Sequence, residues 1–282
     1  SCSETLSVLG APPEQELAAA KELVKASIRR NTRRGSIDMW GCDDICREMD
    51  GVLEKARRRM ERRQYAQAIA LSQYILSTGV KLASEADSSS GSLSYTVDAA
   101  LEIIRESARM LSGSGSTAAE RRRVFDGILK AAKSKVFDGW EDWRYALLRS
   151  AARVTDKKSA AKLYALLDAL LADQAADQYG RDYITAEDME TRFCLIKSLD
   201  GKETARAYLE AHLDVNALRE LAVREDMDAG NYANAERLCL EKAETELYSP
   251  YSHPSRWHEL LYSIYRDAGQ GDKLISQLWR MV

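Results

Sequence analysis

Proline and phenylalanine are scarce in this sequence, with 4 Pro and 3 Phe among 282 residues. Proline interrupts helices and phenylalanine is enriched in strands, so the chain has few helix breakers and little of one residue type that favours sheet. Ala, Leu, Arg and Glu are abundant instead, and all four favour helix. The composition therefore predicts an all-α protein with essentially no strand.

Long apolar runs are also missing. No segment approaches the roughly 18 apolar residues that suggest a membrane span, and the first residues lack the basic, apolar and small-residue order of a secretory signal. Hydrophobic residues at 45% and charged residues at 30% are ordinary for a globular chain with a substantial core. We therefore expect a cytoplasmic protein with no membrane partner.

The cysteines and histidines are few and scattered. The 5 Cys are odd in number and irregularly spaced, which argues against a disulfide framework. Cys42 and Cys46 lie one helical turn apart and would supply two ligands of a zinc site, but no second pair follows, and we interpret both as buried core residues. His258 and Glu259 begin like a helical zinc-protease motif, but Tyr262 stands where the second His belongs. We predict no metal and no cofactor.

No pairing of a nucleophile with a base predicts catalysis. Ser159 and Lys162 have the spacing of a Ser-x-x-Lys motif, but they lie in an Ala- and Leu-rich helix without the motifs that accompany it in enzymes. The glycine-containing segment 112–117 lacks the Gly-Lys-Ser/Thr ending of a phosphate-binding loop. We predict that the protein is not an enzyme and has no catalytic residues.

Apolar residues recur at helical spacing along the chain. The clearest stripe consists of Val97, Leu101, Ile104, Ala108 and Leu111. Steps of four and three residues place such side chains on one face of a helix, which must pack against another element. Comparable stripes predict about a dozen helices with short connections, the pattern of stacked helical hairpins.

The last quarter of the chain indicates which kind of hairpin to expect. Residues 230–235 (GNYANA) open one helix and residues 269–273 (GQGDK) open another. A Gly-polar-aromatic-x-x-Ala opening resembles the start of the second helix of a tetratricopeptide-like pair. The spacing is irregular, with 41 residues from Gly230 to Gly271 and 29 from Gly201 to Gly230. The predicted fold is all-α, with helical-hairpin repeats forming a tetratricopeptide-like α-solenoid or superhelix.

Residues 112–117 (SGSGST) have the composition of a flexible linker. They predict a boundary between an N-terminal helical lobe, residues 1–111, and a C-terminal helical-repeat lobe, residues 118–282. Residues 1–135 carry 22 Lys and Arg against 18 Asp and Glu, whereas residues 136–282 carry 19 against 26. The first part is therefore basic and the second acidic, so the first is suited to an acidic partner.

Several segments resemble a known bacterial group. They are residues 35–38 (GSID), 63–68 (RQYAQA), 73–76 (QYIL) and 257–265 (WHELLYSIY). In this order they are similar to the C-terminal helical, tetratricopeptide-like region of bacterial SWIM-type zinc finger proteins. The finger's own Cys-x-Cys and Cys-x-His pairs do not occur in this sequence. The resemblance implies a helical fold from about residue 35 and an interaction with nucleic acid or protein, without the zinc finger.

Arginine runs and two loop tyrosines are the candidate binding residues. The candidates for an anionic partner are Arg30, Arg33, Arg34, Arg57, Arg58, Arg59, Arg62, Arg63, Arg121, Arg122 and Arg123. If the helices align them, they form a phosphate-contacting surface. The alternative is that they spread around the helix axes and pair with Glu54, Glu61 and Glu120. Tyr248 and Tyr251, in a loop with Ser and Pro, are candidate exposed aromatic contacts.

These observations predict a non-catalytic macromolecular interaction scaffold. The first expectation is that it binds a protein through a concave helical surface, which offers apolar anchors and arginines to an extended or helical partner. The alternative is nucleic-acid binding through the arginine-rich N-terminal lobe, as part of a SWIM-type protein. Binding to nucleic acid would weaken steeply with salt. The partner, the face that binds it and the oligomeric state stay open.

Overall fold

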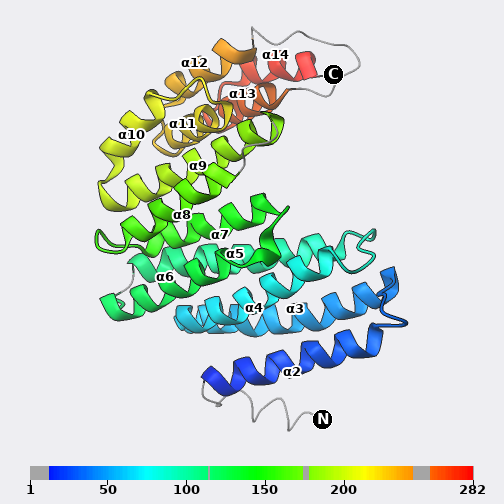
Figure 1. The fold of residues 1–282 in the computed structure, drawn as a ribbon. Coiled ribbons are helices and arrows are strands. Elements are labelled where there is room, and N and C mark those ends of the chain that lie inside the picture. Colours follow the sequence, from blue (N-terminus) through cyan, green and yellow to red (C-terminus); the bar gives the residue numbers. More distant parts are fainter. Residues whose placement is uncertain (1–12, 114, 174–177, 244–254, 282) are drawn as a thin grey trace. The chain divides into compact units, whose positions relative to one another are not determined.

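The computed structural model describes residues 13–113, 115–173, 178–243 and 255–281, and these residues are almost entirely helical (Figure 1). They form thirteen α-helices and one short 3-10 helix. Extended pairing in these ranges is limited to two isolated bridges, Arg33 with Ser36 and Ile37 with Ala86. The prediction of an all-α protein is confirmed. None of the described helices combines the length and apolar character that crossing a bilayer requires.

The helices divide into two compact units, Ser1–Leu199 and Asp200–Val282, called unit 1 and unit 2. Unit 1 contains α2 (Pro13–Asn31), α3 (Met39–Glu61), α4 (Tyr65–Ala83), α5 (Ser92–Gly113), α6 (Ala118–Ala132), η1 (Lys135–Phe137), α7 (Glu141–Val154), α8 (Ala160–Asp173) and α9 (Gln178–Leu199). Unit 2 contains α10 (Lys202–Glu210), α11 (Asn216–Asp228), α12 (Tyr232–Ala243), α13 (Arg256–Asp267) and α14 (Gly271–Met281).

Within unit 1, most helices pack against their neighbours in the chain, and the helices form two rows. The odd-numbered helices α3, α5, α7 and α9 contact one another in succession, and α2, α4 and α6 do so less extensively. Each of α10 to α14 in unit 2 likewise packs against the next. In each unit this neighbour-to-neighbour packing is that of a helical-repeat solenoid, as the periodicity predicts.

One continuous apolar core runs through unit 1, from Ala20 in α2 to Leu195 in α9. The predicted stripe of α5 lies in it: Val97, Ile104, Ala108 and Leu111 are buried, and Leu101 is half-buried against the core. α4 crosses α5 at Gly79, where a Cβ atom would lie 2.6 Å from Cγ2 of Val97. Gly79 therefore permits the close approach of these two helices.

Residues 112–117, predicted to separate two lobes, connect α5 to α6 within unit 1. Ser116 donates a hydrogen bond to the carbonyl of Leu111 (2.7 Å) and its own carbonyl accepts one from Arg121 (2.7 Å). Thr117 caps α6, since its Oγ1 accepts the Glu120 amide. The division into compact units falls after Leu199 instead.

In unit 2, a buried carboxylate organises the connection that the GNYANA segment predicts. Asp226, near the end of α11, accepts hydrogen bonds from Arg206 (2.9 Å), Asn231 (3.3 Å) and Asn234 (2.7 Å). Gly230 adopts a φ of 73°, in the left-handed region that glycine tolerates best. The two asparagines of the segment therefore satisfy Asp226, while Ala235 is buried on the inner face of α12.

The last helix, α14, has an unusual distribution of side chains. Gln277 is buried and donates a hydrogen bond from Nε2 to the His258 carbonyl (3.0 Å). Three apolar residues of the same helix, Ile275, Leu278 and Trp279, are exposed, and Trp279 retains 78% of its accessible surface. A polar side chain is thus buried while apolar side chains contact solvent.

Replacement of Gly79 by Ala tests the α4–α5 crossing. The added methyl group would overlap Val97, and overpacking of this kind costs about 1–3 kcal/mol of unfolding free energy. Gly51→Ala is the matched control because Gly51 is exposed in the interior of α3 with no atom within 4 Å of the added Cβ. That control should gain about 0.5–1 kcal/mol. Urea denaturation followed by circular dichroism measures both, and equal midpoints for the two variants would contradict the tight crossing.

Candidate binding groove

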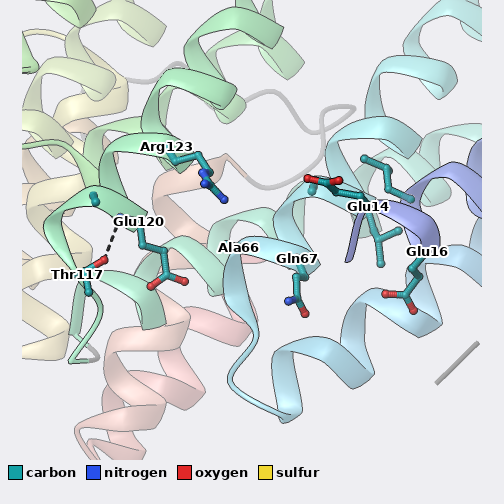
Figure 2. A pocket seen from close by; sticks show the side chains of 11 residues that line it. Glu14, Glu16, Ala66, Gln67, Thr117, Glu120 and Arg123 are labelled. Carbon is teal, nitrogen blue, oxygen red and sulfur yellow. Dashed lines mark hydrogen bonds between the residues drawn. The ribbon is translucent and has the colours of Figure 1, made fainter. Parts of the chain in front are cut away.

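A cavity with charged side chains on its rim lies in unit 1, across the first turns of α2, α4 and α6 (Figure 2). It has a volume of about 490 Å³. Its lining consists of Glu14, Glu16, Leu17, Ala66, Gln67, Ala70, Leu71, Thr117, Ala119, Glu120 and Arg123. Because α2, α4 and α6 all contribute their first turns, all three helices begin at this end of unit 1. We call this cavity the groove.

Small side chains make the groove possible. Ala66 and Ala70 are four residues apart, so they share one face of α4. Their short side chains leave this face without bulky groups over two turns. Ala119 of α6 adds a third small residue, and Leu17 and Leu71 complete the apolar lining. A row of alanines between two helices with longer side chains therefore forms an apolar floor between polar walls.

The walls carry charges that have no ion-pair partner within the described part of the chain. Glu14 belongs to α2, whereas Glu120 and Arg123 belong to α6. Figure 2 shows Glu14 and Arg123 extending into the space between the two helices from opposite sides. None of these three side chains forms an ion pair with another described residue, although many charged residues elsewhere do. The charges of the groove are thus available to a ligand.

A buried ion pair fixes the wall formed by α2. Arg59, near the end of α3, donates from Nε to Glu16 (2.9 Å) and from Nη1 to Gln64 (2.8 Å). The side chains of Arg59 and Glu16 retain only 9% and 5% of their accessible surface. This pair connects the first turn of α2 to the end of α3 and to the residue before α4. It therefore holds two sides of the groove together.

One side chain in the first turn of α4 has unmet hydrogen-bonding capacity. Gln64, the residue preceding the helix, provides no side-chain cap for the first amides, and its Oε1 accepts the hydrogen bond from Arg59. Gln67 lines the groove, and its Oε1 is buried without a hydrogen-bond partner among the described residues. Buried acceptors normally have a partner, so Gln67 is suited to receive a donor from a ligand.

The structure does not bring the three arginine runs onto one surface. Arg30, Arg33 and Arg34 lie at the end of α2 and in the turn before α3, whereas the second run lies at the other end of α3. A helix of 23 residues separates these two runs by about 35 Å. The third run begins α6, at the same end of unit 1 as the second run and the groove.

The arginines also differ in exposure and pairing. Exposed members are Arg30, Arg33, Arg34, Arg57, Arg58, Arg62, Arg63, Arg122 and Arg123, while Arg121 is half-buried. Arg59 is buried against Glu16, which removes it from any exposed anion-binding surface. Arg57 pairs with Glu54 (3.2 Å), as the alternative interpretation predicts. Arg121 is occupied by Ser116. The loop tyrosines Tyr248 and Tyr251 lie outside the described residues.

The cysteines of the first hairpin are core residues, as predicted. Cys42 and Cys46 are both buried in α3. The hydrogen bond that joins their sulfur atoms and their burial raise the pKa of the Cys46 thiol. Among the described residues, no group of three or more His, Cys, Asp and Glu side chains is placed to hold a metal ion.

A second cavity, of about 320 Å³, lies in unit 2 and has a different character. Its lining includes Glu236, Tyr265 and Lys273. Glu236 accepts hydrogen bonds from Lys273 (2.7 and 2.8 Å) and from the Tyr265 hydroxyl (3.0 Å). Its principal charges therefore satisfy one another, in contrast to Glu14, Glu120 and Arg123 of the groove.

Comparison of the chain with protein-family models, curated proteins and solved structures gives no match. The interpretation of the groove therefore depends on its own chemistry. Sequence patterns had selected only Arg123 among its lining residues as a candidate binding residue. The signal that points to its floor, Ala66 and Ala70 on one helix face, is also common in ordinary helix packing.

Substitution of Arg59 tests the buried ion pair. Arg59→Met leaves the Glu16 carboxylate buried without its partner, and such losses cost about 3–5 kcal/mol of unfolding free energy. The double variant Glu16→Leu with Arg59→Met removes both charges and should recover most of that loss. Arg58→Met, an exposed neighbour, is the control and should change stability by less than about 0.5 kcal/mol. Equal urea midpoints for Arg59→Met and Arg58→Met would show that the pair is not stabilising.

Thiol labelling tests the burial of the cysteines. Burial raises the pKa of Cys239 to about 12, so at pH 8 only about one thiol in ten thousand is the reactive thiolate. Because the thiolate of Cys239 forms only as the pH approaches this raised pKa, its rate of labelling should increase as the pH rises. We expect Cys42, Cys46 and Cys239 to resist iodoacetamide in the folded protein at pH 8 and to react fully in urea, as measured by peptide mass spectrometry. Rapid labelling of the folded protein at these positions would contradict the described core.

Proposed function

We propose that the protein is a non-catalytic scaffold that binds a segment of another protein in the groove. The observation that carries this proposal is a preformed cavity with an apolar floor and three charged wall residues that form no ion pair with any residue that the structure describes. Apolar grooves with a few fixed polar groups are the usual form of a peptide-binding site. Binding here would be a function of shape and charge, without chemical change in the partner.

The shape of the groove supports a polypeptide as its occupant. Ala66, Ala70 and Ala119 have short side chains, so a partner backbone can approach the helices closely. The walls come from separate helices that the core and the Glu16–Arg59 pair hold in place. A preformed site reduces the ordering cost of binding. The proposal therefore combines apolar anchoring on the floor with orientation by the wall charges.

We also propose a fold class and a cellular location for the protein. The short helical hairpins and the GNYANA opening of α12 support a tetratricopeptide-like classification, and the sequence composition supports action in the cytoplasm. The association with SWIM-type zinc finger proteins stays a proposal that depends on the sequence resemblance alone.

Nucleic-acid binding is the second candidate. The observation in its favour is the exposure of Arg62 and Arg63 beside the start of α6, where Arg122 and Arg123 are also exposed. Glu14 and Glu120 lie at the same end of the unit and would repel phosphate. The two carboxylates therefore favour a protein segment as the occupant of the groove itself, whereas the four arginines beside it are the basis of the second candidate.

Peptide selection with a blocked groove tests the proposal. Peptides selected from a random displayed library on the wild-type protein should lose at least about tenfold in affinity for Ala70→Trp, because the indole would fill the floor. Ser94→Trp is the matched control, since Ser94 is exposed on α5 away from the groove. Retained binding to Ala70→Trp would overturn the proposed site. Salt-sensitive binding of a labelled DNA duplex that is lost in Arg62→Ala with Arg63→Ala would instead support the second candidate.

A further inference from the structure

We infer that the groove selects a basic, amphipathic segment, one that places a lysine or arginine between the carboxylates of Glu14 and Glu120 with apolar residues on the alanine floor. This inference rests on the proposed function and specifies the chemistry of the partner. Some hydrogen-bond donors and acceptors of the groove are already paired within the protein, and the inference follows from those that are not.

Acceptors without partners outnumber donors in the groove. Of its three carboxylates, that of Glu16 is neutralised by Arg59 at 2.9 Å. Glu14 and Glu120 remain, together with the partnerless Oε1 of Gln67, and all three accept hydrogen bonds. Arg123 is the one charged donor among the lining residues. A ligand that supplies cationic donors therefore meets more of these groups than an anionic one.

The two free carboxylates lie on opposite walls. Glu14 is in the first turn of α2 and Glu120 is in the first turn of α6, where the helix dipole favours negative charge. The apolar floor of α4 lies between them. A cation over that floor therefore has a carboxylate on each wall.

Lysine and arginine side chains suit this arrangement because they are amphipathic. Their methylene stems pack on apolar surface while the charged head reaches a carboxylate. Leu17 and Ala70 supply the apolar surface, and Arg123 lies beside Glu120 on the same helix. Arg123 can donate hydrogen bonds to an acidic side chain or a carbonyl oxygen of the partner, which would fix the direction of the bound segment.

Three labelled model peptides test this inference. They share one Leu and Ala face and carry Lys, Gln or Glu at every polar position, and fluorescence anisotropy at near-physiological salt measures their affinities. We expect the Lys peptide to bind at least about tenfold more tightly than the Glu peptide. The double variant Glu14→Lys with Glu120→Lys should reverse this order. Arg123→Glu should strengthen binding of the Lys peptide.

The control must change net charge equally at another place. Asp98→Lys with Glu203→Lys alters two exposed acids outside the groove. This variant should change the affinity for the Lys peptide by less than about threefold, because salt screens charges at long range. An equal loss in this control would overturn the inference, because general charge would then explain the binding.

Two further outcomes separate the inference from the proposed function. Tighter binding of the Glu peptide than of the Lys peptide, with loss of both in Ala70→Trp, would overturn the preference for a basic segment and leave the groove as a peptide site. Binding of all three peptides that is unchanged in Ala70→Trp would overturn the proposed function together with the inference.

Discussion

The groove depends on a buried ion pair between the first turn of α2 and the end of α3. Glu16 and Arg59 lie 43 positions apart in the chain, and their contact at 2.9 Å places the acidic wall beside the start of α4. Burying two charges is costly unless both are paired and hydrogen-bonded, and Arg59 meets part of this requirement through Gln64 as well. Any other arrangement of α2 would leave these two charges unpaired, so the pair favours the arrangement in which they meet.

The odd-numbered helices of unit 1 supply the rigidity behind this arrangement. They contact one another in succession, and α3, α5 and α7 contain six of the twelve largest fully buried side chains. The row of α2, α4 and α6 packs less extensively, and the groove lies in that row. A firm row behind a more open one keeps the cavity in place, and all its lining residues in the described ranges except Thr117 belong to helices.

The helices were predictable from the sequence because apolar spacing is local. The stripe from Val97 to Leu111 is read within one helix and is buried as expected. The role of Arg59 was not predictable in the same way. It stands in a run of three arginines, and its burial results from Glu16 on a different helix. Spacing also cannot say which of two adjacent residues turns inward when both lie near the apolar face.

The groove itself has no local signature. Its lining comes from three segments that are about fifty residues apart, and Ala66 or Ala119 would look the same in a helix interface. The linker composition of residues 112–117 shows the same limit, because a Ser- and Gly-rich connection can join neighbouring helices of one unit. Charge counts along the chain predicted a basic and an acidic lobe. Which charged side chains lack an ion-pair partner among the described residues depends instead on the contacts between helices.

The direction of the helices has a consequence for how such a chain can change length in evolution. The groove requires that α2, α4 and α6 begin at the same end of unit 1. Loss or gain of a single helix within this region would reverse every helix after it and place a carboxyl terminus where an amino terminus now stands. Gain or loss of two helices preserves the direction. Length variation that keeps the groove should therefore occur in hairpin steps.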